Sequence, residues 1–278
     1  MEKTIEFRGG KLHYRLSGKG SPIMLLHGFG EDSRIWDFQL SYLSSHYLVL
    51  VPDIPGSGKS DCLEERSEKI NGIISYQPSI EDLAQSIKYI LDEEKISTCS
   101  LIGHSMGGYI ALSFARQYPG SLNGLGLFHS TAAADSEEKK WIREKGIAFI
   151  KQYGAAVFLR QTIPNLFSLK FQENHVNEVE AFLHQSEFFS IKALIQYYRA
   201  MMQRIDHKQV LSEFKSPVLI IIGEEDKTVL LQDVISQCYL PDICYVHIWK
   251  GVGHMGMLEN PGRSNEVLLK FLRHAHEN

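Results

Sequence analysis

The sequence contains few cysteines and no long apolar segment. Its four cysteines, at positions 62, 99, 238 and 244, form neither a C-x-x-C pair nor a zinc-binding spacing. We therefore expect reduced thiols and no metal ion. The strongest apolar runs, such as residues 218–222, are much shorter than the roughly 20 residues of a membrane helix. Because the N-terminus also lacks the apolar core of a signal peptide, the sequence predicts a cytoplasmic location.

An excess of charge of either sign is missing as well. Lys and Arg number 29 against 33 for Asp and Glu, which gives a formal net charge of -4 at pH 7. This balance offers no electrostatic basis for binding nucleic acid or an anionic membrane surface. Hydrophobic residues make up 44% of the chain, which is enough to build a core. A length of 278 residues fits one large domain or two small ones.

Short apolar segments alternate with helix-like segments along most of the chain. We expect strands at residues 4–8, 12–16, 22–26, 47–52, 99–102, 122–128, 217–222 and 244–249. The first two flank the pair Gly9 and Gly10, which suits a hairpin turn. Helices are expected around residues 35–43, from Ser79 onward, and at residues 106–118 and 263–274. Short, continuously apolar strands that alternate with helices predict an α/β fold with a parallel sheet buried on both faces.

The alternation stops between residues 132 and 212. This block predicts helices at residues 136–153, 155–162, 173–189 and 191–205, and no strand. An all-helical block inside an α/β pattern indicates an inserted cap rather than a tandem domain. We therefore divide the chain into a core of residues 1–131 and 213–278 and a helical cap of residues 132–212.

Two glycine-rich stretches look like phosphate-binding motifs but lack essential residues. The Gly-Lys-Ser of residues 58–60 would end a P-loop, yet that motif needs glycine where this chain has Asp53. The Gly-Phe-Gly of residues 28–30 would begin a dinucleotide fingerprint, yet the third glycine is replaced by Ser33. The sequence therefore predicts no nucleotide cofactor, and nothing else in it indicates an organic cofactor.

The most specific motif is Gly-His-Ser-Met-Gly-Gly at residues 103–108, between an expected strand and an expected helix. A serine on such a sharp turn projects its hydroxyl clear of the carboxyl edge of the sheet. Gly103 and Gly107 supply the small side chains that let the neighbouring backbones approach. The N–H groups at the start of the following helix favour an oxyanion. Ser105 is therefore the candidate nucleophile.

A second loop, His-Gly-Phe-Gly at residues 27–30, follows the expected strand 22–26. Its glycines would let the loop bend close to the nucleophile. A tetrahedral intermediate needs two hydrogen-bond donors on its oxygen. The backbone N–H groups of Phe29 and Met106 are the candidates for this oxyanion hole.

A serine hydroxyl needs a base that takes its proton. Among twelve histidines, His254 is the best candidate because it lies in a loop between the last strand and the last helix. A carboxylate must orient this imidazole. Three acids crowd residues 224–226, of which Asp226 is the first choice and Glu225 the second. The loop after strand 122–128 has no carboxylate before Asp135, which strengthens the case for Asp226.

Four ordered stretches resemble the α/β-hydrolase superfamily: HGFG at 27–30, DIPGSGKS at 53–60, GHSMGG at 103–108 and GHMGMLENP at 253–261. The chain order serine, acid, histidine is also the order of that superfamily. The resemblance implies a mostly parallel eight-stranded sheet with flanking helices and a helical cap inserted after the sixth strand. It also implies that residues 53–60 form a structural turn rather than a P-loop.

The resemblance narrows the chemistry to a serine hydrolase. Dehalogenase and epoxide-hydrolase relatives use an aspartate where this chain has Ser105. Proline-iminopeptidase relatives carry a tryptophan where this chain has Met106, and carbon–carbon bond hydrolases usually differ at His104. We expect hydrolysis of a small to medium carboxylic ester through an acyl-enzyme. The alternatives are a carbon–carbon bond hydrolase, a perhydrolase or acyltransferase with the same triad, and a ligand receptor that retains the triad.

The substrate pocket is predicted from the loops and the cap together. We expect His27, Gly28, His104 and Trp141 to line it. The cap is rich in large apolar side chains, which either form a pocket for the substrate or pack the core of the cap itself. The expected partner is a small-molecule ester, and the sequence carries no indication of the oligomeric state.

Overall fold

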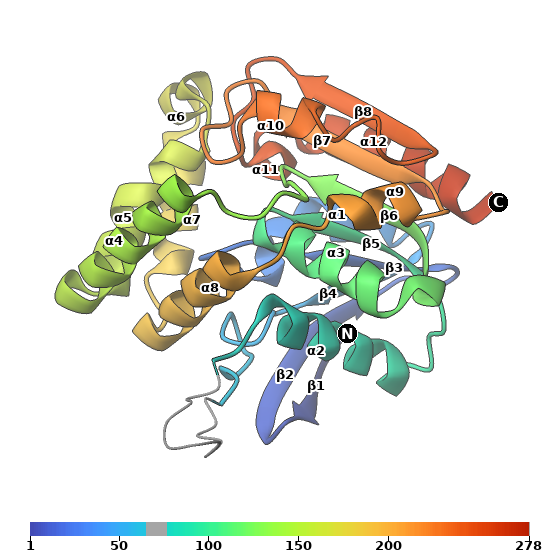
Figure 1. The fold of residues 1–278 in the computed structure, drawn as a ribbon, viewed down its shortest axis with the longest axis horizontal. Helices are drawn as coiled ribbons and strands as arrows, with labels where there is room; N and C mark the ends of the chain where they lie inside the picture. The colour runs from blue at the N-terminus through green and yellow to red at the C-terminus, as the bar shows by residue number, and fades with distance from the viewer. Residues whose placement is uncertain (65–76, 278) are drawn as a thin grey trace.

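An eight-stranded sheet with the order β1-β2-β4-β3-β5-β6-β7-β8 forms the centre of the computed structural model, which describes residues 1–64 and 77–277 (Figure 1). β1 and β2 form a hairpin, β2 runs antiparallel to β4, and the other neighbours run parallel. The strands are β1 (Glu2–Phe7), β2 (Gly10–Ser17), β3 (Pro22–Leu26), β4 (Leu48–Pro52), β5 (Cys99–His104), β6 (Leu122–Phe128), β7 (Val218–Gly223) and β8 (Cys244–Trp249). The predicted fold class, a mostly parallel eight-stranded α/β sheet, is therefore confirmed.

The expected hairpin forms, with its turn one residue earlier than predicted. Phe7 pairs with Gly10, and the two residues between them, Arg8 and Gly9, have φ values of 50° and 80°. A type I′ hairpin turn has positive φ at both central positions, and its twist matches that of the flanking strands. Gly9 adopts this conformation at little cost, whereas Gly10 is free to begin the second strand.

Helices cover both faces of the sheet. Successive strand residues point to opposite faces, so Leu101 and Ile102 of β5 belong to two different buried clusters. α2 (Ile80–Glu93) and α3 (Met106–Gln117) pack on one face, and α1 (Asp37–Leu43) and α12 (Pro261–Glu277) on the other. Shorter elements complete this part of the chain: η1 (Ser33–Trp36), η2 (Pro119–Ser121), α10 (Leu231–Ile235) and α11 (Gly256–Glu259).

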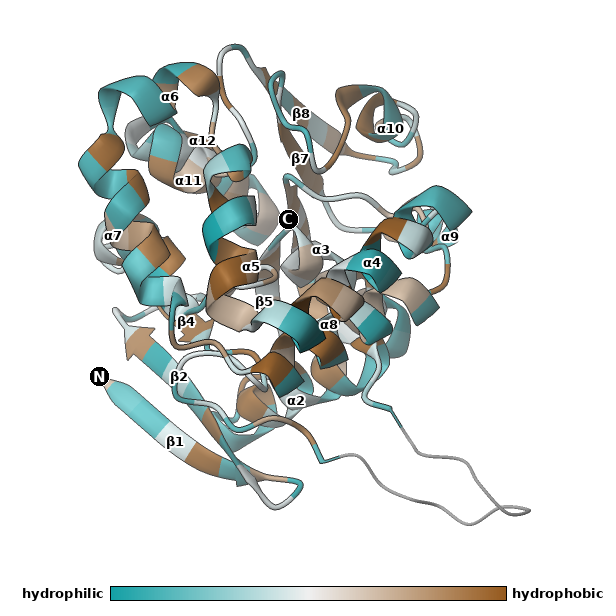
Figure 2. Ribbon diagram, turned by 90° about the vertical axis from the view of Figure 1, so that its left-hand side faces the viewer, coloured by the Kyte–Doolittle hydropathy of each residue, from teal (hydrophilic) through white to brown (hydrophobic). Residues whose placement is uncertain are grey.

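Only helices lie between β6 and β7, all of whose connecting residues the structure describes. They are α4 (Glu137–Tyr153), α5 (Ala155–Thr162), η3 (Ile163–Leu166), α6 (Leu169–Asn174), α7 (Val176–Ser186), α8 (Ile191–Gln203) and α9 (Lys208–Glu213). Most of them gather to one side of the sheet in Figure 1. Figure 2 shows hydrophilic and hydrophobic residues mixed along α4 and α7, as expected for amphipathic helices that pack on one side.

Two details of this insert differ from its expected course. The single helix expected at residues 173–189 is divided at His175, whose φ and ψ of -131° and 45° are not helical. Ser168 caps the preceding helix α6 by accepting from the N–H of Phe171, so α6 begins earlier than predicted. α9 packs against α3 of the sheet layer, so the division between core and cap at residue 212 stays a prediction.

Across residues 1–64 and 77–277, no helix combines the length and the apolar character needed to cross a bilayer.

Candidate active site

Loops that follow four parallel strands bring the candidate catalytic residues to one edge of the sheet. Phe29 follows β3, Ser105 follows β5, Asp226 follows β7 and His254 follows β8. The carboxyl ends of parallel strands meet at the same edge, which is where open α/β sheets bind their ligands. Residues that are far apart in the chain therefore become neighbours because of the strand order alone.

Ser105 occupies a strained turn between β5 and α3. Its φ and ψ are 50° and -116°, a left-handed conformation that non-glycine residues rarely adopt. Hydrogen bonds hold both of its peptide groups, because its N–H donates to the carbonyl of Phe128 at 3.0 Å and its carbonyl accepts from the Ser130 hydroxyl at 2.7 Å. Hydrogen bonds to β6 and to the loop that follows it thus stabilise the turn.

Two backbone N–H groups remain for the predicted oxyanion hole. In the oxyanion loop, the N–H of Gly28 already donates to Oε2 of Glu31 at 2.6 Å. The next N–H, that of Phe29, has no acceptor in residues 1–64 and 77–277. Met106 is the first residue of α3, so its N–H lies outside the hydrogen-bond ladder of that helix. These are the two donors that the sequence predicts.

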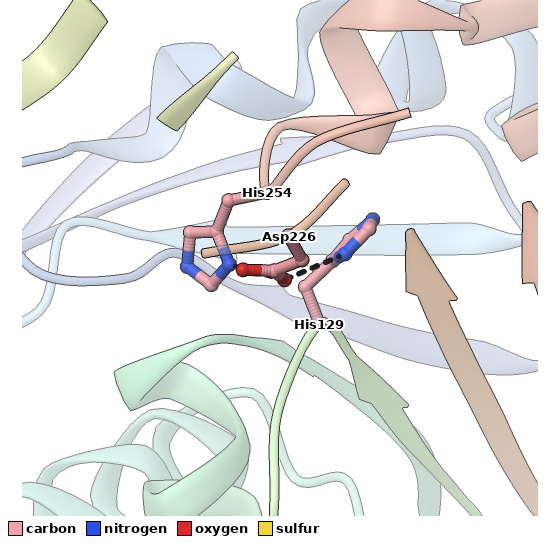
Figure 3. Close-up of side chains that lie close together, drawn as sticks. All are labelled: His129, Asp226 and His254. Atoms are coloured by element: carbon pink, nitrogen blue, oxygen red, sulfur yellow. Dashed lines mark hydrogen bonds and ion pairs between the residues drawn. The ribbon is translucent and has the colours of Figure 1, made fainter. Parts of the chain in front are cut away.

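Asp226 and His254 form a buried hydrogen-bonded pair. His254 Nδ1 lies 2.7 Å from Asp226 Oδ2, and because a carboxylate only accepts, Nδ1 carries a proton and donates it (Figure 3). His254 Nε2 is thereby left without a proton, as the role predicted for this histidine requires. Burial lowers the pKa of His254, but the charge and hydrogen bond of Asp226 outweigh burial and raise it above its ordinary value. The arrangement keeps the imidazolium stable once it forms.

The carboxylate of Asp226 accepts four hydrogen bonds in total. Oδ1 accepts from the backbone N–H groups of Thr228 and Val229 at 2.8 and 2.9 Å. Oδ2 accepts from His254 and from a second histidine, His129, whose Nδ1 lies 3.1 Å away on the other side of the carboxylate (Figure 3). Burial raises the pKa of Asp226, but His254 and these hydrogen bonds hold it well below its ordinary value. The carboxylate is therefore ionised at neutral pH.

His129 is a site residue that sequence reasoning missed. It is the first residue after β6, in a loop that offers no carboxylate before Asp135, and it adopts a φ of 50°. Burial lowers the pKa of His129 to about 4, so the ring is neutral at pH 7. The three groups His129, Asp226 and His254 are also of metal-ligand type. Their separations of 2.7 and 3.1 Å are nevertheless those of hydrogen bonds.

Glu31 was missed as well, because it belongs to no recognised motif. Its Oε2 lies 2.9 Å from His104 Nδ1, and His104 Nε2 lies 3.0 Å from the backbone carbonyl of His254. Glu31 and His104 thus connect the oxyanion loop, the residue before the nucleophile and the histidine loop. Burial raises the pKa of Glu31, but His104 and the N–H of Gly28 lower it more, so the carboxyl is ionised.

A cavity of about 290 Å³ lies between this edge of the sheet and the inserted helices. Ser105, His254 and Phe29 all line it, so the candidate nucleophile, the candidate base and the predicted oxyanion loop face one space. The other lining residues from the sheet side are Glu31, Tyr109, Lys227 and Thr228, and those from the insert are Arg143, Leu159, Thr162, Ile163, Asn165, Leu166, Tyr198 and Met201. The cavity suits a small molecule with both apolar and polar groups.

None of the four residues predicted for the pocket lines this cavity. Trp141 lies on the outer side of α4 with 61% of its surface exposed, where Lys145 lies over its ring. His27 is fully buried and joins two loops, since Nδ1 donates to the carbonyl of Gly28 and Nε2 accepts from the N–H of Ile54. Gly28 and His104 pack beside Ser105, where a Cβ on Gly28 would lie 3.0 Å from Ser105 Cβ and 3.1 Å from His104 Nδ1.

Known proteins resemble this chain over nearly its whole length. The 2-hydroxy-6-oxo-6-phenylhexa-2,4-dienoate hydrolase of Comamonas testosteroni is 26% identical over 273 residues, which cover 94% of this chain and 91% of the relative. Among solved structures, a thermophilic esterase from Thermogutta terrifontis has a TM-score of 0.89, with 24% identity and 99% of both chains covered. The enol-lactonase from Burkholderia xenovorans has a TM-score of 0.87, with 19% identity, and covers 98% of this chain and 100% of its own.

The family described as serine aminopeptidase, S33, has a model that matches residues 20–260, which is most of the chain. That match agrees with the eight-stranded sheet, with the helices inserted after β6 and with the strained serine at the end of β5. The protein is therefore a hydrolase that belongs to the serine aminopeptidase S33 family of the α/β-hydrolase superfamily.

Proposed function

We propose that this hydrolase cleaves small to medium carboxylic esters through an acyl-enzyme on Ser105, with His254 as the base and Asp226 as the acid. One observation carries the proposal. Ser105 and His254 line the same cavity, and the Nδ1 proton of that histidine is held by a buried carboxylate. This leaves Nε2 unprotonated at the cavity, as a general base requires.

The acylation half of the reaction follows from these roles. His254 Nε2 takes the proton of the Ser105 hydroxyl as the oxygen attacks the ester carbonyl carbon. The carbonyl oxygen becomes an oxyanion that accepts from the N–H groups of Phe29 and Met106. When the carbon–oxygen bond to the alcohol breaks, the imidazolium returns its proton to the leaving alcohol. The acyl group is then an ester of Ser105.

Deacylation uses the same groups in reverse. His254 takes a proton from a water molecule, whose oxygen attacks the acyl carbon. The oxyanion forms again in the same hole, and collapse of the intermediate returns the proton to the oxygen of Ser105. The carboxylic acid leaves and the free enzyme is restored. Throughout the cycle Asp226 stays ionised and stabilises the imidazolium.

The nucleophile is tested with a fluorophosphonate probe and with a panel of p-nitrophenyl acyl esters. We expect the native protein to be labelled on Ser105 and to turn over the short and medium esters. Ser105→Ala should lose the label and at least about 10⁴-fold in kcat. Ser212→Ala, which changes an exposed serine of α9, is the matched control and should keep both. Undiminished turnover by purified Ser105→Ala would show that Ser105 is not the nucleophile.

A carbon–carbon bond hydrolase is the second candidate, and the relative from Comamonas testosteroni favours it. That protein acts on a dienoate and is similar over 94% of this chain. Both reactions would use the same cavity and the same histidine, so the site geometry does not separate them. Steady-state kinetics on 2-hydroxy-6-oxo-6-phenylhexa-2,4-dienoate and on an ester of similar size separate the two. Ester hydrolysis is contradicted if only the dienoate is cleaved.

A further inference from the structure

The side of the cavity formed by the inserted helices carries a partly buried cation. Arg143 of α4 lines the cavity, and only 17% of its side chain is exposed. Nε donates to Oδ2 of Asp135 at 2.6 Å, and one Nη2 hydrogen donates to Oδ1 at 3.2 Å. A guanidinium group has five N–H donors. In residues 1–64 and 77–277 the remaining ones have no acceptor, so part of the group is available to a ligand in the cavity.

The negative partner of Arg143 is shared with another arginine. The side chain of Asp135 is completely buried, and its Oδ1 lies 2.7 Å from Nη1 of Arg204. Arg204 is itself held by donation to the backbone carbonyls of Met201 and Ala133. One carboxylate therefore faces two guanidinium groups, and the cluster keeps a surplus positive charge. Because Arg204 has its hydrogen bonds within the protein, Arg143 is the member that presents this charge to the cavity.

Aromatic rings fix the position of Arg143 relative to the reacting groups. Its guanidinium carbon lies 5.4 Å from the ring centre of Tyr198, within the range of a cation–π contact. The ring of Tyr198 stacks on that of Phe29, with centres 4.4 Å apart and planes 8° from parallel. One aromatic ring thus separates the cation from the oxyanion loop. With its ester carbonyl at Ser105, a substrate would extend its remaining chain along these rings toward Arg143.

Two other charged side chains line the cavity, and neither competes for this role. Glu31 lies on the sheet side, where Oε2 accepts from Gly28 N–H and faces His104. Its charge is therefore compensated next to the nucleophile. Lys227 is exposed to solvent at the rim, where water screens its charge. The cavity therefore has an anion, Glu31, on the sheet side and a cation, Arg143, on the side of the inserted helices.

We propose that Arg143 is a specificity-determining residue that binds a free carboxylate, so that the substrate is an ester bearing a second, ionised carboxyl group. Guanidinium groups recognise carboxylates through paired N–H donors, and partial burial strengthens such contacts. The anchor on Asp135 holds the guanidinium in one orientation before the substrate arrives, which reduces the entropy lost on binding. This inference rests on the proposed ester hydrolysis and adds the class of ester.

A matched pair of substrates tests it on the native enzyme. Ethyl hydrogen glutarate and ethyl glutaramate have nearly the same shape, but only the first carries a carboxylate. A charge-assisted hydrogen bond should favour the charged ester by about 10-fold or more in kcat/KM. A second pair, butyryl glycolate and butyryl glycolamide, places the charge on the alcohol side. Equal rates within both pairs, or a preference for the amides, would overturn the proposal.

Variants then assign the preference to one residue. Arg143→Gln should reduce the ratio of charged to neutral rates to about one, and Arg143→Lys should restore part of it. Lys145→Gln removes the same charge from an exposed position on the same helix and should leave the ratio unchanged. If the native preference survives in Arg143→Gln, or disappears in Lys227→Gln instead, the assignment to Arg143 is wrong.

The two proposals fail in different ways in this experiment. If the native enzyme hydrolyses none of the four esters and none of the p-nitrophenyl esters, the proposed function fails. If it hydrolyses charged and neutral esters equally well, ester hydrolysis stands and only the role of Arg143 is overturned. Since the native preference is measured without any substitution, a variant that does not fold leaves the proposal falsifiable.

Discussion

At the scale of single residues, the site depends on how buried charges are satisfied. Asp226 receives donors at all four of its acceptor positions, and two of these donors are histidines that lie on either side of it. A buried carboxylate without such partners would take up a proton and could no longer stabilise the imidazolium. The second histidine, His129, is neutral and therefore adds a donor without adding a charge.

The pKa of His254 predicts how the rate depends on pH. The base must be neutral to accept a proton, so kcat/KM should fall as the pH is lowered through the pKa of His254. Because Asp226 raises that pKa above the ordinary 6.5, the acid limb should have its midpoint above pH 6.5. Asp226→Asn should shift the limb to lower pH and reduce kcat by about 10⁴-fold. A pH–rate profile of the native enzyme with a midpoint below 6.5 would contradict this.

The contact between Glu31 and His104 predicts a positioning effect. Glu31→Gln removes the negative charge that faces His104, whose other nitrogen contacts the carbonyl of His254. We expect a loss of about 10- to 100-fold in kcat with little change in KM, since the substrate still binds the same cavity. Glu178→Gln, which changes an exposed carboxylate of α7, is the control. If Glu31→Gln has the same kcat as the native enzyme, Glu31 does not act as a positioning residue.

At the scale of elements, the turn around Ser105, the proposed nucleophile, depends on the close approach of neighbouring backbones. A Cβ on Gly103 would lie 2.2 Å from the carbonyl oxygen of Gly107 and 2.4 Å from the nitrogen of Gly108. A Cβ on Gly107 would lie 2.6 Å from the carbonyl oxygen of His27. These contacts are with main-chain atoms, which have no side-chain freedom to move away. The glycines therefore allow β5, α3 and the oxyanion loop to meet.

This crowding predicts the cost of adding one methyl group. Gly103→Ala should destabilise the fold by roughly 1–3 kcal/mol or more, because backbone must shift to make room. Gly120→Ala, in the turn before β6, meets no atom within 4 Å and is the matched control. Urea unfolding of both variants measures the difference in the free energy of unfolding. Equal stability of the two variants would show that the turn relaxes freely.

At the scale of the whole molecule, the inserted helices and the sheet side both contribute residues to the candidate active site. The N–H of His254 donates to the carbonyl of Leu166 in η3 at 2.6 Å. Glu259 accepts from the N–H of Ser168, in the insert, and from that of Gly253, which directly precedes His254. Both peptide groups of His254 are thus held, one by the insert and the other by His104. The insert therefore positions His254, the proposed base, and also lines the cavity.

Buried charges in the sheet layer and in the insert predict that lowering the pH destabilises the whole fold. The pKa values of Glu31, Asp135 and Asp226 are below their ordinary values, so the stability that these groups contribute is lost as the pH falls through their folded values. The pKa of His129 is lowered from 6.5 to about 4, so the unfolded chain binds its proton first. The free energy of unfolding should therefore decline below about pH 6.5 and more steeply below about pH 4.

Urea unfolding measures the free energy of unfolding at each pH. Measurements between pH 7 and pH 3, in steps of roughly one unit, cover the range where these groups titrate. The free energy of unfolding should decrease at each step to lower pH. This is because a folded carboxylate or a neutral buried histidine must take up a proton as the chain unfolds. His254 acts in the opposite direction, but its contribution is already complete below pH 6.5 because its folded pKa is raised. A free energy of unfolding that rises on acidification would contradict the prediction.

Much of the fold could be predicted because the information is local. Short apolar strands, the glycines beside Ser105 and the order of the loops follow from neighbouring residues, and β3, β6 and β8 have the predicted bounds. The predicted helix at 173–189 was wrong because the periodicity of side chains does not reveal a non-helical residue such as His175. The size and apolar character of Trp141 predict a place in the pocket, yet only packing decides which side of α4 faces inward, and Trp141 is exposed.

The sequence by itself determined the α/β sheet, the strained serine turn and the order of serine, acid and histidine, because each depends on residue types at short spacing. Tertiary structure alone decided which side chains share the site. Glu31 contacts His104 and His129 contacts Asp226, partners that lie 73 and 97 positions away in the chain. Arg143 lies only eight positions from its partner Asp135, but the cavity that it lines also contains residues from the sheet side. Their charges and hydrogen bonds act over a few ångströms of space, which only folding brings about.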